Sequence, residues 1–519
     1  MRGSKSLQQR NAGYRGAAAI CVMKATCRRF LRKTVSTRGI LRLSLLSTPQ
    51  PPVTMIQATW RARTDLGDGM SIRGLAGFLR VSSALGLLII ASAQANAGGF
   101  ALREQSTYGQ GTSFAGVAAG GALSSMFWNP ATMTQVPGIV SETNVAGVFP
   151  FASHTPIAGT YVPALPGTSN VGDAAALFAG YTSYQLNPNL WLGVSINAPF
   201  GLSESFPDAW AGRNYAAGNT LVRTYNAVPS IAYRFNDWLS VGAGVQIQYA
   251  KAQFSRGLPS PPVGPFPLGS EASFEGKGWS YGATAGVTLT PTPTTAIGLG
   301  WRSGLNQKIK GDLVSLSLPT PPFPPSTLGS VATTAQLPDI VSLGIRQRVD
   351  PQWTLMGTVE WANWSRIGTA NFVQPNGSPA TVLGSPLAVH FEYRDGWFFS
   401  GGAEYIWSDR LTVRGGIGYE ISPITDQVRE PNVPDNNRVY ASIGASWKVF
   451  RGLHFDLAYT HIFIKEGPIN ISATSGNPTF NGTINYIGNV NVHADVLSLA
   501  LVARFDEIEP AARRPFLKY

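Results

Sequence analysis

Long stretches of this chain alternate between apolar residues and small or polar residues with a period of two. One face of residues 239–249 carries Leu, Val, Ala, Val, Ile and Tyr, whereas the other face carries Ser, Gly, Gly, Gln and Gln. Residues 437–449 and 497–505 alternate in the same way. This period predicts β-strands with one apolar face. It does not by itself separate a membrane barrel from a soluble β-sandwich, which shows the same alternation.

The lengths of the connections between the strands separate these two fold classes. Even-numbered strands are followed by tight turns such as Asn187-Pro188-Asn189, whereas odd-numbered strands are followed by loops of roughly sixteen to twenty-eight residues, an arrangement typical of bacterial outer-membrane barrels. We therefore predict an all-β fold, a 14-stranded antiparallel transmembrane β-barrel over residues 139–505. The predicted strands are 139–149, 172–184, 190–199, 219–235, 238–254, 272–290, 295–310, 337–348, 352–363, 390–407, 410–419, 437–449, 452–464 and 493–505.

Tryptophans gather near the ends of the predicted strands, where they suit the two aromatic girdles of a membrane barrel. The alternative is that they form a core, which would need a large apolar interior. Lumen faces made mostly of Gly, Ser, Gln and Thr do not provide one. The tryptophans in question are Trp191, Trp238, Trp301, Trp353, Trp361, Trp364, Trp397, Trp407 and Trp447.

The formal net charge of +12 comes from the first part of the chain. Residues 1–97 hold 15 Lys and Arg but only 2 Asp and Glu, which leaves 25 basic and 26 acidic residues for the remaining chain. A nucleic-acid partner therefore loses its support. Both cysteines, Cys21 and Cys27, also lie in this first part, and the lack of cysteine in residues 98–519 fits an exported protein that avoids misoxidation.

Residues 70–97 are predicted to be a cleavable signal peptide. Arg73 and Arg80 form its positive end, residues 81–91 its apolar core, and Ala95-Asn96-Ala97 its cleavage site. The core is too short to span a bilayer, which argues against the alternative of a membrane anchor. Residues 1–69 show no periodicity, and we interpret them as a mis-called or disordered leader, with Met70 as the real start.

The stretch between the signal peptide and the first strand, residues 98–138, is rich in Gly and Ala and has no regular period. Such a stretch cannot bury much surface by itself, so something larger must hold it. A barrel of about fourteen strands encloses a lumen wider than its own side chains can fill. We predict that residues 98–138 form an N-terminal hatch, a plug inside the lumen.

Several motifs resemble the FadL-type family of long-chain fatty acid transporters of Gram-negative outer membranes, which includes toluene and xylene uptake relatives. The resemblance covers residues 98–505 and implies a 14-stranded barrel with an N-terminal hatch in the outer membrane. The motifs are GGFALREQS at 98–106, Trp128-Asn129-Pro130-Ala131, Leu337-Pro338-Asp339, and residues 348–353, 359–366, 414–419, 422–424 and 433–435.

The same resemblance implies where a substrate binds and leaves. It places Phe100 and Leu102 in an apolar pocket near the N-terminus, and it places the motif Asn129, Pro130 and Ala131 near an inward kink in the third strand. The kink opens a lateral gate, and it corresponds here to Asn197, Ala198, Pro199, Phe200 and Gly201. Pro199 and Gly201 independently predict a break in strand pairing. The alternatives are an ordinary strand exit at 197–201 and a plain turn at Asn129-Pro130.

The predicted function is passive uptake of a hydrophobic molecule, which binds in the pocket and leaves sideways into the membrane. We interpret the substrate as a long-chain fatty acid, with a monoaromatic hydrocarbon of the toluene type as the alternative. A general porin or an adhesin is a further alternative. A carboxylate headgroup would need a cation. The candidates are Lys251, Arg256, Lys308 and Lys310; alternatively, each is a solvated charge or faces lipopolysaccharide.

An enzyme is the alternative from a different functional class. No recognisable motif contains His154, His390, His454, His461 or His493, and no spacing of metal ligands occurs, so we predict no catalysis, no metal and no cofactor. The expected partners are outer-membrane lipid, lipopolysaccharide and the barrel assembly machinery, and we expect a monomer. Two features depart from the family: proline-rich loops at 258–269 and 318–329, which exclude helix, and a C-terminal tail at 506–519.

Overall fold

The computed structural model describes residues 99–158, 160, 165–261, 264–317, 326–382 and 384–507. The side chains of residues 314–317, 326–328 and 385 are not described. The predicted leader at 1–69, the signal peptide at 70–97 and most of the C-terminal tail lie outside the described residues. The chain divides into two compact units, residues 1–70 and 71–519, and all of the described structure belongs to the second.

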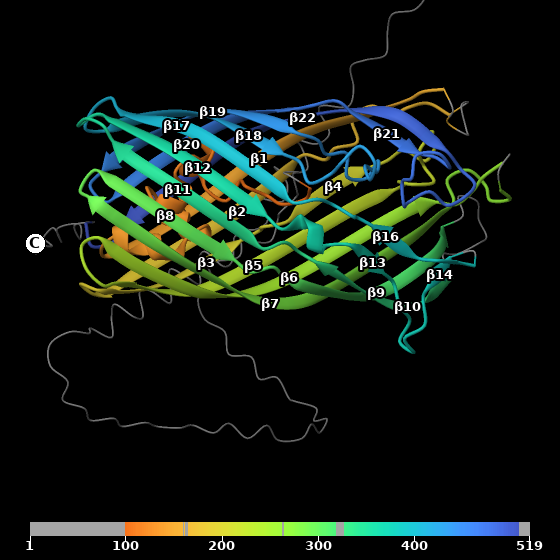
Figure 1. Cartoon of the computed structure of the whole chain (residues 1–519), viewed down its shortest axis with the longest axis horizontal. Coiled ribbons are helices and arrows are strands. Elements are labelled where there is room, and N and C mark those ends of the chain that lie inside the picture. Colours follow the sequence, from red (N-terminus) through yellow and green to blue (C-terminus); the bar gives the residue numbers. More distant parts are fainter. Residues whose placement is uncertain are drawn as a thin grey trace, which may run out of the picture. The chain divides into compact units, whose positions relative to one another are not determined.

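The described strands form one closed antiparallel sheet, which confirms the predicted 14-stranded barrel (Figure 1). The sheet has eighteen labelled strands, and in four cases two consecutive strands continue one another along the wall. The barrel wall therefore consists of fourteen strands, and we call each of these, whether continuous or in two parts, a stave. The staves are β1 (Ile139–Pro156), β2 (Ala175–Asn187), β3 (Leu190–Asn197) with β4 (Gly201–Ser205), β5 (Asn219–Arg234), β6 (Leu239–Gly257), β7 (Glu271–Thr292), β8 (Thr295–Arg302) with β9 (Asn306–Ser317), β10 (Ser326–Gln336) with β11 (Ile340–Arg348), β12 (Trp353–Ala362), β17 (Gly396–Ile406), β18 (Leu411–Ile421), β19 (Arg438–Phe450), β20 (Leu453–Ile464) with β21 (Gly467–Ile471), and β22 (Tyr486–Arg504).

The first and last staves close the barrel. β1 pairs with β22 from Val140 opposite Arg504 to Pro156 opposite Gly488. Backbone groups exposed to hydrocarbon cannot bond to water, so a spanning sheet must have no free edge. The long register between β1 and β22 meets this requirement. No helix in the described part of the chain is long and apolar enough to cross a membrane.

The period of two places apolar side chains on the outside of the wall. On β22 the side chains of Leu497, Leu499 and Leu501 are exposed, whereas Ser498 and Ala500, which lie between them, are buried. An apolar outer face suits lipid, and small inner residues leave room within the barrel. The same rule predicts the outward direction of Trp353 and most of the other tryptophans that we assigned to girdles.

Two of the nine tryptophans are not in a girdle, so the prediction was wrong for them. Trp191 is fully buried and donates its indole N–H to the carbonyl oxygen of Val136 at 3.0 Å. Trp364 is also buried, in the short helix η4 (Trp364–Arg366) that follows β12. The residues that lie inside the barrel bury these two rings, which the inward faces of the strands alone could not do.

The described part of the predicted hatch, residues 99–138, contains short helices and lies inside the ring of strands (orange in Figure 1). We call it the N-terminal segment. Its helices are α3 (Thr107–Gln110), η1 (Val117–Ala119), η2 (Leu123–Phe127) and η3 (Pro130–Gln135). Glycines on inward faces let it approach closely. A Cβ atom added at Gly298 of β8 would lie less than 3.0 Å from the carbonyl oxygen of Ala118, and one at Gly416 of β18 less than 3.0 Å from that of Thr112. The role of this segment as a hatch stays a prediction here.

The long loops differ in part from the predicted ones. β10 begins at Ser326, so residues 326–329 of the predicted loop at 318–329 are strand, and residues 318–325 are not described. The loop at 258–269 contains no helix in its described residues, as its prolines require. Between β12 and β17 lie two small hairpin sheets, β13 (Thr369–Asn371) with β16 (Ala388–His390) and β14 (Thr381–Val382) with β15 (Ser385–Pro386).

Candidate substrate-binding site

The third stave is interrupted at residues 198–200, between β3 and β4. β3 pairs with β2 from Leu190 opposite Asn187 to Ile196 opposite Gly180. Beyond the interruption, β4 pairs with β5, and only an isolated bridge joins Gly172 to Glu204 on the side of β2. Within the described residues, positions 175–179 of β2 therefore have no paired partner in the third stave. Proline at 199 supplies no N–H group, which is why the ladder stops there.

The start of the N-terminal segment binds the interrupted stave in place of a full strand. The N–H of Leu102 donates to the carbonyl oxygen of Pro199 at 2.8 Å, and the N–H of Gly201 donates to that of Phe100 at 2.9 Å. The side-chain amide of Gln105 bonds twice to the backbone of Ala198, donating to its carbonyl oxygen at 2.8 Å and accepting from its N–H at 3.2 Å. Residues 100–105 thus hold the broken end of β3 in place.

Aromatic and aliphatic side chains enclose an apolar pocket beside this contact. The ring centroid of Phe100 lies 4.9 Å from that of Trp364, 6.0 Å from that of Phe200 and 6.2 Å from that of Phe391. The cavity has a volume of about 50 Å³. We call this site the apolar pocket; besides Phe100, Phe200 and Phe391, its walls include Leu202, Phe274, Ile309, Leu337, Phe372, Val389 and Val433.

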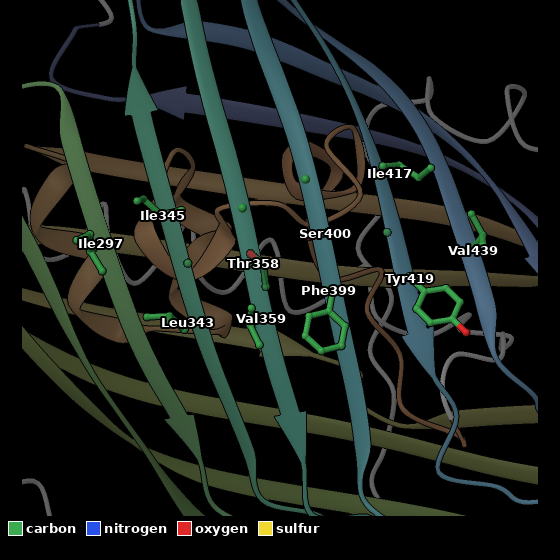
Figure 2. A pocket seen from close by; sticks show the side chains of 14 residues that line it. Ile297, Leu343, Ile345, Thr358, Val359, Phe399, Ser400, Ile417, Tyr419 and Val439 are labelled. Carbon is green, nitrogen blue, oxygen red and sulfur yellow. The ribbon is translucent and has the colours of Figure 1, made fainter.

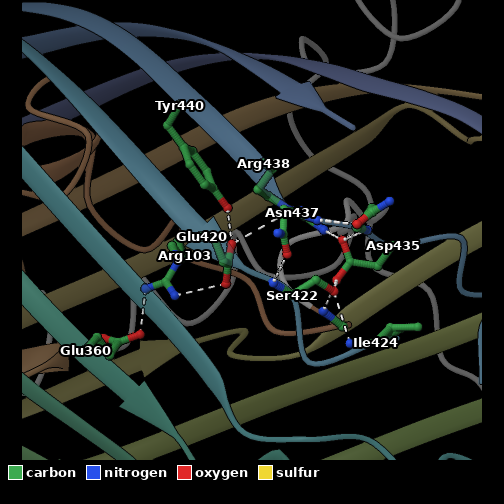
Figure 3. Close-up of polar contacts among 11 residues, drawn as sticks. Arg103, Glu360, Glu420, Ser422, Ile424, Asp435, Asn437, Arg438 and Tyr440 are labelled. Atoms are coloured by element: carbon green, nitrogen blue, oxygen red, sulfur yellow. Dashed lines mark hydrogen bonds and ion pairs between the residues drawn. The ribbon is translucent and has the colours of Figure 1, made fainter. Parts of the chain in front are cut away.

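A buried ionic network anchors the N-terminal segment to the wall below the apolar pocket (Figure 3). The guanidinium of Arg103 donates to the carboxylate of Glu360 on β12 at 2.5 Å and to that of Glu420 on β18 at 3.1 Å. The hydroxyl of Tyr440 on β19 donates to Glu420 at 2.6 Å. Burying a charged group costs less free energy when it is paired, so these contacts hold Arg103 in place.

A second carboxylate binds the very start of the described chain. Asp435 accepts hydrogen bonds from the N–H of Gly99 at 2.8 Å and from the hydroxyl of Ser422 at 2.6 Å, and it is also paired with Arg438. Asp435 belongs to the loop between β18 and β19, which also supplies Val433 to the apolar pocket. The same contacts therefore fix Gly99 on one side of Phe100, while Arg103 fixes the other.

Glu104 is a buried carboxyl in the same segment, and one of its oxygens has no hydrogen-bond partner in the described part of the chain. Burial raises the pKa of Glu104 to about 7, although its own backbone N–H and the charges of Arg103 and Arg438 oppose the shift. The docked segment therefore holds a proton between about pH 4.5 and 7 that an undocked segment loses. Because the docked form binds more protons, docking weakens as the pH rises through this window.

This sign gives a testable pH dependence. We expect the hydrogen-exchange protection of residues 99–106, relative to that of β22, to fall between pH 5 and pH 8 in the parent protein. Replacing Glu104 by Gln removes the titrating group and should make the relative protection independent of pH. A variant that keeps the same decline as the parent protein would show that another group controls docking.

The predicted site residues do not all lie together. Phe100 and Phe200 meet at the apolar pocket, whereas Leu102 borders a neighbouring cavity. Asn129 lies against β7, where its side-chain amide donates to the carbonyl oxygens of Ala118 and Val287 at 2.8 and 3.0 Å. Pro130 and Ala131 follow it and approach Gly242 of β6. Asn129, Pro130 and Ala131 therefore support the segment and do not line the apolar pocket.

Most of the predicted headgroup cations are occupied or point away. Lys251 borders the apolar pocket, but its ammonium pairs with Glu275 at 2.6 Å. Arg256 pairs with Glu430 at 3.3 Å. Lys308 and Lys310 are exposed, because Ile309 between them faces the apolar pocket. None of the four is a free cation at the pocket, so none is a good carboxylate site in this arrangement.

A larger hollow lies on the outer surface of the wall and is unrelated to the lumen (Figure 2). Its volume is about 730 Å³. Leu343, Ile345, Val359, Phe399 and Ile417, which line it, are exposed side chains of β11, β12, β17 and β18. In a membrane this surface faces lipid tails. Within the described residues, no group of three or more His, Cys, Asp or Glu side chains could hold a metal ion.

A closed 14-stranded barrel with an apolar outer face, an internal segment and an apolar pocket beside an interrupted stave defines a class, the outer-membrane transport barrels. The family model described as "Outer membrane protein transport protein (OMPP1/FadL/TodX)" matches residues 88–505. The chain belongs to this family. It is thus an outer-membrane protein and a transporter of hydrophobic substrates.

The matches to individual relatives extend over nearly the whole length of those proteins. The chain is 25% identical over 457 residues to the long-chain fatty acid transport protein of Escherichia coli K12, covering 79% of this chain and 98% of that protein. It is 26% identical over 463 residues to outer membrane protein P1 of Haemophilus influenzae, covering 80% and 96%.

Solved structures show the same fold. A Pseudomonas aeruginosa FadL homologue superposes with a TM-score of 0.69 at 24% identity, covering 79% of this chain and all of that one. The Ralstonia pickettii toluene transporter TbuX superposes with a TM-score of 0.56 at 19% identity, covering 76% and 97%. At these sequence identities the similarity shows a shared fold and nothing more specific.

Proposed function

We propose that the protein takes up long-chain fatty acids passively and releases them sideways through the interruption in the third stave. The observation that carries this proposal is the position of the apolar pocket. Phe100 and Phe200 line it, and the same residues border the interruption at 198–200. A molecule bound there lies next to positions 175–179 of β2, which within the described residues lack a partner in the third stave. The fatty acid transport proteins among the curated relatives support the choice of substrate.

The N-terminal segment acts in this proposal as the hatch. Its close approach to the inward faces of β8 and β18 and its hydrogen bonds to side chains of β1 and β19 support this role. A filled lumen blocks the flow of water and ions, so a substrate has to leave through the wall. The lipid bilayer accepts a hydrophobic product, and no energy source is needed when affinity rises along the path.

Burial of the acyl chain supplies the driving force. Removing about twelve methylene groups from water yields roughly 10 kcal/mol before the entropy costs of binding. The apolar pocket has a volume of about 50 Å³, comparable to roughly two water molecules. A long chain therefore fits only when aromatic side chains such as Phe100 and Phe200 move apart. Phe100 sits on the segment that also binds Pro199, so its movement couples pocket opening to the interrupted stave.

A monoaromatic hydrocarbon is the second candidate, because the pocket is small and its walls are rich in aromatic rings. Growth of a deletion strain separates the two. Loss of growth on oleate, restored by the parent gene, supports the fatty acid proposal, whereas loss of growth on toluene alone supports the second candidate. Unchanged growth on both would contradict both proposals.

The apolar pocket itself is tested by replacing Phe100 with Ala. We expect oleate binding to weaken by about 2 kcal/mol, or roughly thirtyfold, because one buried aromatic side chain no longer contacts the ligand. Isothermal titration of the purified protein gives the affinity, and uptake by cells should fall with it. Phe149→Ala is the matched control, because Phe149 is an exposed ring on the outer face of β1. Equal uptake by the parent and by Phe100→Ala would show that the pocket is wrongly assigned.

A further inference from the structure

A second cavity adjoins the apolar pocket and carries a buried positive charge. Leu102, Trp128, Pro199, Arg302, Glu360 and Trp364 are among its lining residues. We call it the Arg302 cavity. The ring of Trp364 borders this cavity and lies edge-on to Phe100 of the apolar pocket, with the centroids 4.9 Å apart. Movement of Phe100 would therefore join the two spaces.

Arg302, the last residue of β8, is a buried cation that forms no direct ion pair within the described residues. Its side chain points into the barrel, where only 4% of the residue is exposed. The guanidinium donates to the carbonyl oxygen of Phe127 at 2.9 Å and to the side-chain oxygen of Gln246 at 2.7 Å, and it lies over the Phe127 ring at 4.2 Å. Within the described residues, no carboxylate comes within 4.0 Å of it.

The acidic groups of the cavity are already engaged elsewhere. Arg103 occupies both Glu360 and Glu420, and the hydroxyls of Ser342 and Tyr440 bond to the remaining oxygens of these carboxylates. Among the described residues Arg302 thus directly contacts neutral oxygens and an aromatic ring, although the charge of Glu360 in the same cavity acts on it from beyond 4.0 Å. Burying a charge without a counter-charge in direct contact is costly, and an anion that binds the guanidinium reduces this cost. A planar guanidinium also matches a carboxylate with two parallel N–H groups.

We propose that Arg302 binds the carboxylate of the substrate while the acyl chain occupies the apolar pocket. This inference rests on the proposed function and narrows its substrate class to amphipathic acids. The headgroup points toward Arg302 and Pro199, which line the same cavity, so the acid reaches the interrupted stave headgroup first. A neutral hydrocarbon gains nothing from Arg302. With Arg302 as the headgroup site, none of the four cations predicted from the sequence is required. Each of them is either paired or exposed.

The test compares an acid with its neutral ester. Oleate and methyl oleate share one acyl chain, and only oleate carries a carboxylate. For the purified full-length protein we expect Arg302→Gln to weaken oleate binding by about tenfold or more, since a buried charge pair is lost. Methyl oleate binding should stay within about twofold of the parent value. Arg302→Lys keeps the charge and should retain most of the preference for oleate over its ester.

Arg234→Gln is the matched control. Arg234 is also a partly buried barrel arginine that lies over a tryptophan ring, that of Trp191 at 4.9 Å, and donates to a backbone carbonyl of the N-terminal segment. It lines neither the apolar pocket nor the Arg302 cavity. Its replacement should leave both affinities unchanged. The heat-dependent shift of folded barrels in gel electrophoresis verifies that every variant has assembled.

The possible results separate the inference from the proposed function. Loss of oleate binding alone in Arg302→Gln supports the inference. Equal loss for oleate and methyl oleate, or no loss for either, overturns it while the proposed function stands. If the parent protein binds neither compound, the proposed function is wrong and the inference is wrong with it.

Discussion

Replacing Pro199 and Gly201 with Val is expected to abolish most fatty acid uptake while the barrel still assembles. Valine at 199 restores a backbone N–H group, and valine at 201 removes the flexibility of glycine, so the third stave can pair with positions 175–179 of β2. About three new ladder hydrogen bonds at roughly 1 kcal/mol each would make the open gap on the order of a hundredfold rarer. The measurement is the rate of labelled oleate uptake by cells that carry equal amounts of folded protein.

A proline elsewhere in the wall provides the control for this experiment. Pro229 lies in β5 opposite Val194 of β3, with its side chain on the exposed face. Its pairing with β3 is continuous, and the ladder with β6 skips residues 228 and 229 but resumes in the same register at Ser230. Pro229→Val should transport oleate at the parent rate. Parent-like uptake by the Pro199→Val, Gly201→Val protein would rule out lateral exit at this place.

Replacing Arg103 with Gln has the second large expected effect, release of the N-terminal segment from the wall. The change leaves Glu360 buried without its cation and Glu420 with only Arg438 at 3.8 Å, which costs about 3–5 kcal/mol. The equilibrium constant for docking of residues 99–106 should fall by more than a hundredfold. Hydrogen exchange of these residues measures the effect directly, with β22 as the internal reference.

A charge-neutral variant controls for the loss of the arginine itself. Arg103→Met combined with Glu360→Gln and Glu420→Gln removes the cation and both carboxylates together, so neither carboxylate stays buried without Arg103. It should recover most of the protection lost in Arg103→Gln. If Arg103→Gln alone keeps full protection, the ionic network does not hold the segment.

The strands were predictable because their signal is local. Each stave alternates with a period of two, and tight turns such as Asn187-Pro188-Asn189 set its ends. The same local signal failed where a stave is interrupted. We treated residues 295–310 as one strand, yet the interruption at residues 303–305 shifts the phase, so that Arg302 faces inward on β8 while Lys308 and Lys310 face outward on β9.

The candidate site depends on contacts that no local pattern contains. Arg103 meets Glu360 and Glu420, partners that are 257 and 317 residues away in the sequence. Single charges on the small-residue faces of strands were the available signal, since a charge inside a barrel needs a partner. The burial of Trp364 was equally hard to predict, because one of the rings that contacts it, that of Phe100, is distant in the sequence.

The central claim is that the N-terminal segment closes the lumen, so that substrate passes through the wall and not along a water-filled pore. Conductance of the purified protein in planar lipid bilayers tests it most directly, with a variant that lacks residues 98–138 but retains the export signal for comparison. The parent protein should carry little or no steady ionic current, and the shortened variant should carry a large one. A steady current through the parent protein equal to that of the shortened variant would contradict the account.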